Sequence, residues 1–249
     1  MKIICDGHAH LGTPREREYR REQGIVTMIC AEDAAQAGEL SAMDGDWIVK
    51  ACGLHPWKAD LRALRDMEPW LSRTKIVGEI GLDSVWCQVD MDVQREVFER
   101  QLEIASEGGK PVVLHVKGME REAAERIRRH PGRYLVHWYS DMEWLDLYLE
   151  QDCYFSVGPD VAVNPAVQQV ARRADLSRLL VETDGFGAVR WALGEDFPLD
   201  GLRGVLERSL DWIADERGVD RGKVREIAED NFRRFSGLTL TPSDSSDRE

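Results

Sequence analysis

The segment Ile3-Ile4-Cys5-Asp6-Gly7-His8-Ala9-His10 decides the fold, because it joins a short β-like apolar run to a pair of histidines. In an extended segment the side chains of residues i and i+2 project on the same side, so both imidazoles can reach one metal ion. A His-x-His pair alone is a weak signal for a metal site. Its weight depends on whether further strands of the chain end in ligand-type side chains.

Seven more β-like runs follow the first, and stretches with helical periodicity separate them. The eight expected strands are residues 3–5, 26–29, 48–52, 76–79, 112–115, 134–137, 154–157 and 179–182. Strands that alternate with helix-length segments imply parallel pairing through crossover helices. Eight such units fit a closed barrel better than an open sheet. We therefore predict an α/β protein built as a single (β/α)8 TIM barrel.

The segments between and after the strands support one domain. The expected amphipathic helices are residues 93–106, 119–129, 144–150, 165–173, 200–217 and 221–235. The 249-residue length suits such a barrel, which commonly uses about 250 residues. We predict one barrel domain over residues 1–238. Because residues 239–249 are polar and contain a proline, we expect a disordered tail there.

Composition limits the classes of partner. The net charge of −13, from 33 basic and 46 acidic residues, argues against tight non-specific binding to nucleic acid, which needs a basic surface. It does not exclude a phosphate substrate, because bound divalent ions make a site locally positive. No apolar run reaches the roughly 18 residues of a membrane span, and no secretory signal opens the chain. We expect a cytoplasmic protein without membrane contact.

The five cysteines agree with that location. They are an odd number and include no Cys-x-x-Cys pair. Cys5, Cys30, Cys52 and Cys153 lie in or beside β-like runs, where a thiol behaves as a small buried hydrophobe. We interpret these four as reduced packing residues, and Cys87 is expected in a loop.

The histidines gather where the barrel would place an active site. Five of the six lie at or just after the end of a predicted strand: His8, His10, His55, His115 and His137. Two carboxylates, Glu79 and Asp184, share this position. The carboxyl ends of barrel strands converge on one mouth, and a ring of imidazoles and carboxylates there can bind divalent metal. One such histidine could be merely structural, and we interpret His130, near a helix end, in that way.

At these residues the sequence resembles the TatD family of metal-dependent hydrolases. The resemblance extends over about residues 3–238 and keeps the order and spacing of the family. It is carried by the segments Asp6-Gly7-His8-Ala9-His10-Leu11, Gly53-Leu54-His55-Pro56-Trp57, Gly78-Glu79-Ile80-Gly81-Leu82-Asp83, Gln94-Arg95-Glu96-Val97-Phe98, Gln101-Leu102, Pro111-Val112-Val113-Leu114-His115, His137-Trp138-Tyr139-Ser140, Leu180-Val181-Glu182-Thr183-Asp184 and Asn231-Phe232-Arg233-Arg234-Phe235.

The resemblance implies a TIM barrel of the metal-dependent hydrolase type that holds two divalent ions. By similarity, His8, His10 and Asp184 bind one ion, His115 and His137 bind the other, and Glu79 bridges them. Glu79 stands where many relatives in the wider barrel group carry a carboxylated lysine. Family members are associated with DNA hydrolysis, as 3′–5′ exonucleases or at abasic sites, and some relatives act on aminoacyl-tRNA esters.

The chain departs from the family pattern at its rim loops. A Ser-Pro-Tyr segment is typical after the position of Asp184, and here the chain reads Gly185-Phe186-Gly187-Ala188-Val189-Arg190-Trp191. Ser84-Val85-Trp86 replaces the usual aromatic pair, and the connection after His10 is short. These departures leave the substrate open and the metal site intact.

The predicted reaction is attack of a metal-activated water on a phosphodiester, as in a TatD-type DNase. Asp184 would ligate, orient the water and take its proton, and Glu79 is the second predicted catalytic residue. His55 would contact the substrate phosphate, and its alternative is a ring hydrogen-bonded beside Pro56. The side chains of Trp86, Trp138 and Trp191 could stack on bases, or they could simply pack the rim.

Three functions stay open from the residues. The first is a phosphodiesterase acting on nucleic-acid ends or a small phosphodiester. The second is a metal-dependent esterase or amidase, such as an aminoacyl-tRNA deacylase. The third is a partner-dependent module with a structural metal centre. The mixed ligand set suits zinc, manganese, iron or nickel, and magnesium less well. The sequence is silent on oligomeric state, for which we favour a monomer.

Overall fold

The computed structural model describes residues 2–238, and its eight parallel strands are hydrogen-bonded in chain order. Just after the last strand, the backbone N–H of Asp184 donates to the carbonyl of His8 on the first strand at 3.1 Å. The sheet thus returns on itself, and the predicted (β/α)8 barrel is confirmed. The strands are β1 (Ile4–His10), β2 (Ile25–Ala31), β3 (Ile48–Cys52), β4 (Val77–Asp83), β5 (Val112–Lys117), β6 (Tyr134–Val136), β7 (Tyr154–Val157) and β8 (Leu179–Val181).

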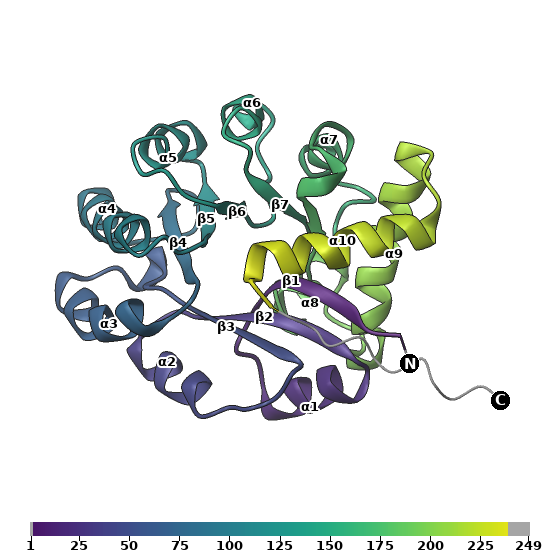
Figure 1. Cartoon of the computed structure of the whole chain (residues 1–249), viewed down its shortest axis with the longest axis horizontal. Helices are drawn as coiled ribbons and strands as arrows, with labels where there is room; N and C mark the ends of the chain where they lie inside the picture. Colours follow the sequence, from purple (N-terminus) through teal and green to yellow (C-terminus); the bar gives the residue numbers. More distant parts are fainter. Residues whose placement is uncertain (1, 239–249) are drawn as a thin grey trace.

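Helices α1 to α7 and α9 surround the strands, and α10 crosses one end of the barrel (Figure 1). The α-helices are α1 (Pro14–Glu22), α2 (Ala34–Ser41), α3 (Leu61–Arg73), α4 (Met91–Glu107), α5 (Glu120–Ile127), α6 (Leu145–Leu149), α7 (Pro165–Arg173), α8 (Phe186–Leu193), α9 (Leu202–Arg217) and α10 (Arg221–Ser236). Short 3-10 helices are η1 (Pro56–Lys58), η2 (Leu176–Arg178) and η3 (Leu199–Gly201). The tail expected at residues 239–249 lies outside the described residues. No helix among residues 2–238 is long and apolar enough to cross a membrane.

Alternation along each strand divides the core into two layers. On β5, Leu114 packs in the outer layer with the helices, whereas Val113 belongs to an inner cluster within the barrel. Side chains two residues apart share a face of a strand, so His115 and Lys117 point into the barrel with Val113. The inner layer is therefore apolar at one end and polar at the other.

Helix α10 covers the apolar end of the barrel. The side chains of Phe232 and Phe235 are fully buried in the inner cluster. The Asn231 amide donates to the carbonyls of Leu176 and Leu179, both at 2.7 Å, which ties the helix to the start of β8. Because this end is covered, the polar end is the one that can admit a substrate.

A buried cation holds the seam between the first and last strands. Arg20 on α1 is only 1% exposed, and its guanidinium donates to Asp6 on β1 at 2.5 Å and to Glu16 at 3.0 Å. The same group donates to Thr27 on β2 and to Thr183 beyond β8, at 3.1 and 2.8 Å. The cluster thus links α1 with both sides of the barrel closure. These contacts were not predicted from the sequence.

Several predicted boundaries were wrong at the mouth, where β2 and β5 each extend two residues beyond their predicted ends and three further segments differ. Strand β1 continues through His8 and His10, because His10 still pairs with Cys30 on β2. Strand β4 likewise continues past Glu79, since Gly81 pairs with His115. The residues expected as a loop after Asp184 form helix α8. In each case the cause is pairing or packing with a distant segment, which local periodicity does not report.

The cysteines are all free, as expected. Cys5, Cys30, Cys52 and Cys153 are buried, and Cys87 is partly exposed in the segment between β4 and α4. The four buried thiols are packing residues of the core.

Candidate metal centre

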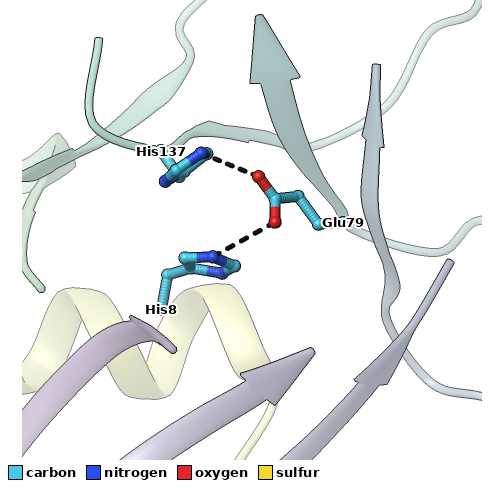
Figure 2. A group of neighbouring side chains, drawn as sticks. All are labelled: His8, Glu79 and His137. Atoms are coloured by element: carbon cyan, nitrogen blue, oxygen red, sulfur yellow. Dashed lines mark ion pairs between the residues drawn. The ribbon is translucent and has the colours of Figure 1, made fainter. Parts of the chain in front are cut away.

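Glu79 lies at the middle of the polar end of the barrel, with its side chain fully buried. Its Oε1 is 2.8 Å from His115 Nδ1 and 2.7 Å from His137 Nε2. Its Oε2 faces the opposite way, 3.3 Å from His8 Nε2. Figure 2 shows the carboxylate between His8 and His137, with one oxygen directed at each ring. The two oxygens of one side chain therefore serve two different groups of imidazoles.

Asp184 completes the group on the side of β1. Its Oδ1 is 3.2 Å from His8 Nε2 and 3.1 Å from His10 Nε2. His10 Nε2 also lies 3.8 Å from Glu79 Oε2. The six side chains predicted as metal ligands thus come together at one place, from β1, β4, β5 and the ends of β6 and β8.

The backbone is adapted to bring these groups close. A Cβ on Gly81 would lie 1.7 Å from the carbonyl oxygen of His115, so only glycine permits this approach of β4 to β5. Asp184 has a φ of 57°, in the left-handed region that costs a non-glycine residue about 1–2 kcal/mol. Such strain is typical of functional sites, where surrounding packing holds it.

Each of three histidines directs one ring nitrogen to the centre and the other to an outer carboxylate. His115 Nε2 is 3.0 Å from Asp83 Oδ2, His10 Nδ1 is 3.2 Å from Glu32 Oε1, and His137 Nδ1 is 3.5 Å from Glu182 Oε1. The contact of His115 with Asp83 is a hydrogen bond, which would hold the proton on the far nitrogen and leave the near nitrogen's lone pair free to ligate. The contacts of His10 and His137 are ion-pair distances without hydrogen-bond geometry.

No role was predicted from the sequence for Glu32, Asp83 or Glu182. Two of them, Asp83 and Glu182, stand inside the quoted family segments, two or four residues from a predicted ligand. Alternation along a strand could have placed Glu182 beside Asp184. The neighbour of His10 comes from another strand end, so no local signal identifies Glu32.

The charge states of the carboxylates follow from their neighbours. Burial alone raises the pKa of Glu79, but the imidazoles of His137 and His8 outweigh it and hold the pKa well below its ordinary value. Burial also opposes ionisation of Asp184, and His10 outweighs it, so that this pKa is lowered as well. Loss of hydration lowers the pKa of His10, yet Asp184 and Glu79 raise it to about 9. Both carboxylates are therefore ionised and attract cations.

The side-chain atoms at the centre fit a bound metal. Within the described chain, His8 Nε2, Glu79 Oε2 and Asp184 Oδ1 are buried and have no hydrogen-bond partner. Buried polar atoms are normally paired, so three converging orphan atoms require a partner of another kind. Three groups have ligand atoms within 4.8 Å of one another: His8, Glu79 and His137; His8, His10 and Asp184; His55, Glu79 and His115. Imidazole nitrogens and carboxylate oxygens suit a divalent transition metal.

His55 lies at the same centre but differs in the nitrogen that it presents. Its side chain is only 3% exposed, and Nε2 is 3.7 Å from Glu79 Oε2 and 3.3 Å from His115 Nδ1. Its Nδ1 accepts the backbone N–H of Trp57 at 3.2 Å, so a neutral ring carries its proton on Nε2. Burial, first, and the neighbouring imidazoles hold the pKa of His55 well below its ordinary value. His55 therefore offers a donor to the centre.

Among the three rim tryptophans, Trp191 is in contact with each of the other two, and the three differ in exposure. The ring of Trp191 on α8 lies between the other two, with centroids 6.1 Å from Trp86 and 6.0 Å from Trp138. Trp138 directly follows His137 and is 7% exposed, whereas Trp86 and Trp191 are 50% and 67% exposed. His130 is remote from this region and pairs with Glu99.

The chain is similar to a known protein family over residues 5–237. A family model described as "TatD related DNase" matches residues 5–237. The chain belongs to the TatD family. Its fold agrees with that of YjjV, the TatD homologue from Escherichia coli K12, with a TM-score of 0.80 and 20% identity over 95% of this chain and 98% of that one.

Two relatives of this TatD-family chain carry the name of a metal-dependent hydrolase. "Uncharacterized metal-dependent hydrolase YcfH" from Escherichia coli strain K12 is 26% identical over an aligned length of 256 residues. The alignment covers 94% of this chain and 95% of the relative. "Uncharacterized metal-dependent hydrolase YabD" from Bacillus subtilis strain 168 is 28% identical over 209 residues, 73% of this chain and 80% of the relative. The protein is a metal-dependent hydrolase of the TatD family, with candidate metal-binding groups of histidine, glutamate and aspartate.

Proposed function

We propose that this TatD-family hydrolase cleaves phosphodiester bonds at a binuclear centre, in the manner of a DNase acting from strand ends. The observation that carries the proposal is the two-sided arrangement of Glu79. One of its oxygens faces His115 and His137 within 2.8 Å, and the other faces His8 at 3.3 Å. A carboxylate in this position can bridge two cations, with His10 and Asp184 completing the ligands of the first.

Divalent ions bound there would lower the pKa of a bound water from about 16 towards 7 and polarise the bond under attack. The protein residues would have separate tasks. Asp184, whose side chain is 15% exposed, would orient the attacking water and accept its proton. His55 would donate from Nε2 to a phosphate oxygen, because its Nδ1 is already engaged with Trp57.

The outer carboxylates would hold the ligand histidines in the protonation state that binding requires. Asp83 would accept the Nε2 proton of His115, and the nearby charges of Glu32 and Glu182 would favour a proton on the Nδ1 atoms of His10 and His137. Removing such a partner typically costs about 10- to 100-fold in metal affinity or activity. These residues therefore act through the ligands and not on the substrate.

The family description supports a nucleic-acid substrate, since it names a DNase. The net charge of −13 argues for short substrates or ends, because tight binding of a long polyanion needs a basic surface. The rim tryptophans would supply contacts to bases that do not depend on charge. The identity of the metal is left to experiment, with zinc, manganese, magnesium, nickel and iron as candidates.

The test is to load the protein with manganese or magnesium and to offer single-stranded DNA, bis-p-nitrophenyl phosphate and an aminoacyl ester. Phosphodiester turnover that is lost in Glu79→Ala supports the proposal. Ester cleavage without phosphodiesterase activity overturns it in favour of a metal-dependent esterase. Bound metal with every substrate inert overturns it in favour of a structural metal centre.

A further inference from the structure

The rim of the barrel carries three tryptophans, Trp86, Trp138 and Trp191, which we call the aromatic shelf. Each follows a strand that supplies a residue of the metal centre: Trp86 comes after β4, Trp138 directly after His137, and Trp191 after Asp184. The rings meet edge to face, with interplanar angles of 78° between Trp86 and Trp191 and 75° between Trp138 and Trp191. The shelf therefore begins one residue from the centre and extends outward.

Trp138 is the fixed end of the shelf. Its carbonyl accepts from the ammonium group of Lys117, itself buried, at 2.5 Å. Its indole Nε1 donates to Asp160 Oδ1 at 2.8 Å, and its backbone has a φ of 35°. A Cβ on Gly158 would lie 2.6 Å from the indole ring, so glycine is needed where the ring packs. Contacts from β5 and from beyond β7 thus determine where this ring stands.

The outer end of the shelf is open to solvent. Trp86 is 50% and Trp191 67% exposed, and the nearby sequence adds Val85 and Leu193, which are 54% and 40% exposed. Exposed apolar groups that gather at one place mark a binding surface more often than chance. Two rings at nearly a right angle form a corner in which a planar group can stack on one ring and meet the edge of the other.

Two cations near the mouth, Lys58 and Arg190, are already engaged with carboxylates. Lys58 pairs with Glu32 and Asp33 at 3.0 and 2.6 Å. Arg190, on the same helix as Trp191, pairs with Glu195 at 2.9 Å. A long polyanion is held by many unpaired lysines and arginines, so these contacts favour an occupant that is held by its ring.

We propose that the aromatic shelf is a nucleobase-binding subsite, which holds the base of a mononucleotide ester while its phosphodiester lies at the metal centre. The position of the phosphodiester at the metal centre rests on the proposed function, whereas binding of the base to the shelf does not. Stacking of a base on an aromatic side chain is worth about 1–3 kcal/mol. Loss of one ring is therefore expected to weaken binding by about 5- to 150-fold, at 1.36 kcal/mol for each tenfold.

The first test measures binding of deoxyadenosine, which has no phosphate, to the full chain in the presence of a chelator. Calorimetric titration of Trp191→Ala and Trp86→Ala is expected to show the weakening given above, and Trp191→Phe is expected to retain most of the affinity. The control is Trp212→Phe, because Trp212 lies on α9, under Arg172 of α7, and is not part of the shelf. Equal affinity in wild type and Trp191→Ala overturns the subsite.

The second test compares two esters with the same leaving group: thymidine 5′-(p-nitrophenyl phosphate), which carries a base, and methyl p-nitrophenyl phosphate, which carries none. In Trp191→Ala the ratio of their kcat/KM values is expected to fall by about 5-fold or more. A ratio equal to that of wild type overturns the proposal. If neither ester is cleaved by wild type but deoxyadenosine binding depends on Trp191, the proposed phosphodiesterase fails and the subsite stands.

Discussion

Replacing Glu79 by glutamine removes one charge from the centre with almost no change in shape. In the structure the carboxylate has both oxygens within 3.3 Å of imidazole nitrogens, and it is fully buried. The neutral amide offers one oxygen and one N–H group, so it cannot serve two cations at once. We therefore expect Glu79→Gln to lose the bridge while the barrel keeps its fold.

The magnitude follows from the charges involved. Two unit charges about 4 Å apart interact by about 4 kcal/mol at an effective dielectric constant of 20. Each 1.36 kcal/mol corresponds to tenfold, so the loss is about a thousandfold in the affinity for the second ion or in kcat/KM. Glutamine should therefore leave at most one tightly bound metal equivalent per chain.

The assay combines metal analysis after dialysis, calorimetric titration with manganese, and hydrolysis of bis-p-nitrophenyl phosphate. Glu99→Gln is a matched control, because Glu99 also pairs with a histidine, His130, but lies on α4 away from the centre. Circular dichroism and thermal unfolding in chelator verify that both variants are folded. Two equivalents bound to Glu79→Gln with the affinity of wild type would refute the bridging role.

Three further outcomes are expected. Gly81→Ala places a Cβ 1.7 Å from the carbonyl oxygen of His115, so we expect the free energy of unfolding in urea to fall by at least about 3 kcal/mol. A free energy of unfolding equal to that of wild type would contradict this contact. Arg20→Met leaves Asp6 buried without its cation and should cost about 3–5 kcal/mol, measured in the same way; a neutral effect would show that the cluster is dispensable. The pKa of His10 is raised to about 9 in the metal-free protein, so a metal ion must displace a proton from this ring below that pH. Manganese affinity should therefore rise between pH 6.5 and 8.5 in calorimetric titrations. A constant affinity would contradict the role of His10 as a ligand.

The barrel could be predicted because its signals are local. Short apolar runs alternate with amphipathic segments along the chain, and two strands, β3 (Ile48–Cys52) and β7 (Tyr154–Val157), have the predicted bounds. The convergence of the six candidate ligands followed from one geometric rule, that the carboxyl ends of barrel strands meet at one mouth. Neither inference needs knowledge of a specific long-range contact.

The mouth itself was predicted less well. Strand β1 extends through His10, β4 extends to Asp83, and helix α8 occupies the residues expected as a loop. A strand continues for as long as a neighbouring strand can pair with it, and the register of that neighbour is not encoded locally. The proposed substrate contacts lie on these same segments, so the choice among substrates would depend on the part of the chain that was hardest to predict.

The sequence by itself determined the fold class and the seven candidate side chains at the strand ends, because strand periodicity and the position of each side chain along its strand are properties of short segments. The family resemblance then implied which six of the seven are ligands. The tertiary structure alone decided that Glu79 faces two groups of imidazoles, that Arg20 holds the barrel closure and that Lys117 and Asp160 hold Trp138. These contacts join residues from different strands and loops. Their geometry depends on the register and closure of the whole barrel, which is settled only when every strand is paired.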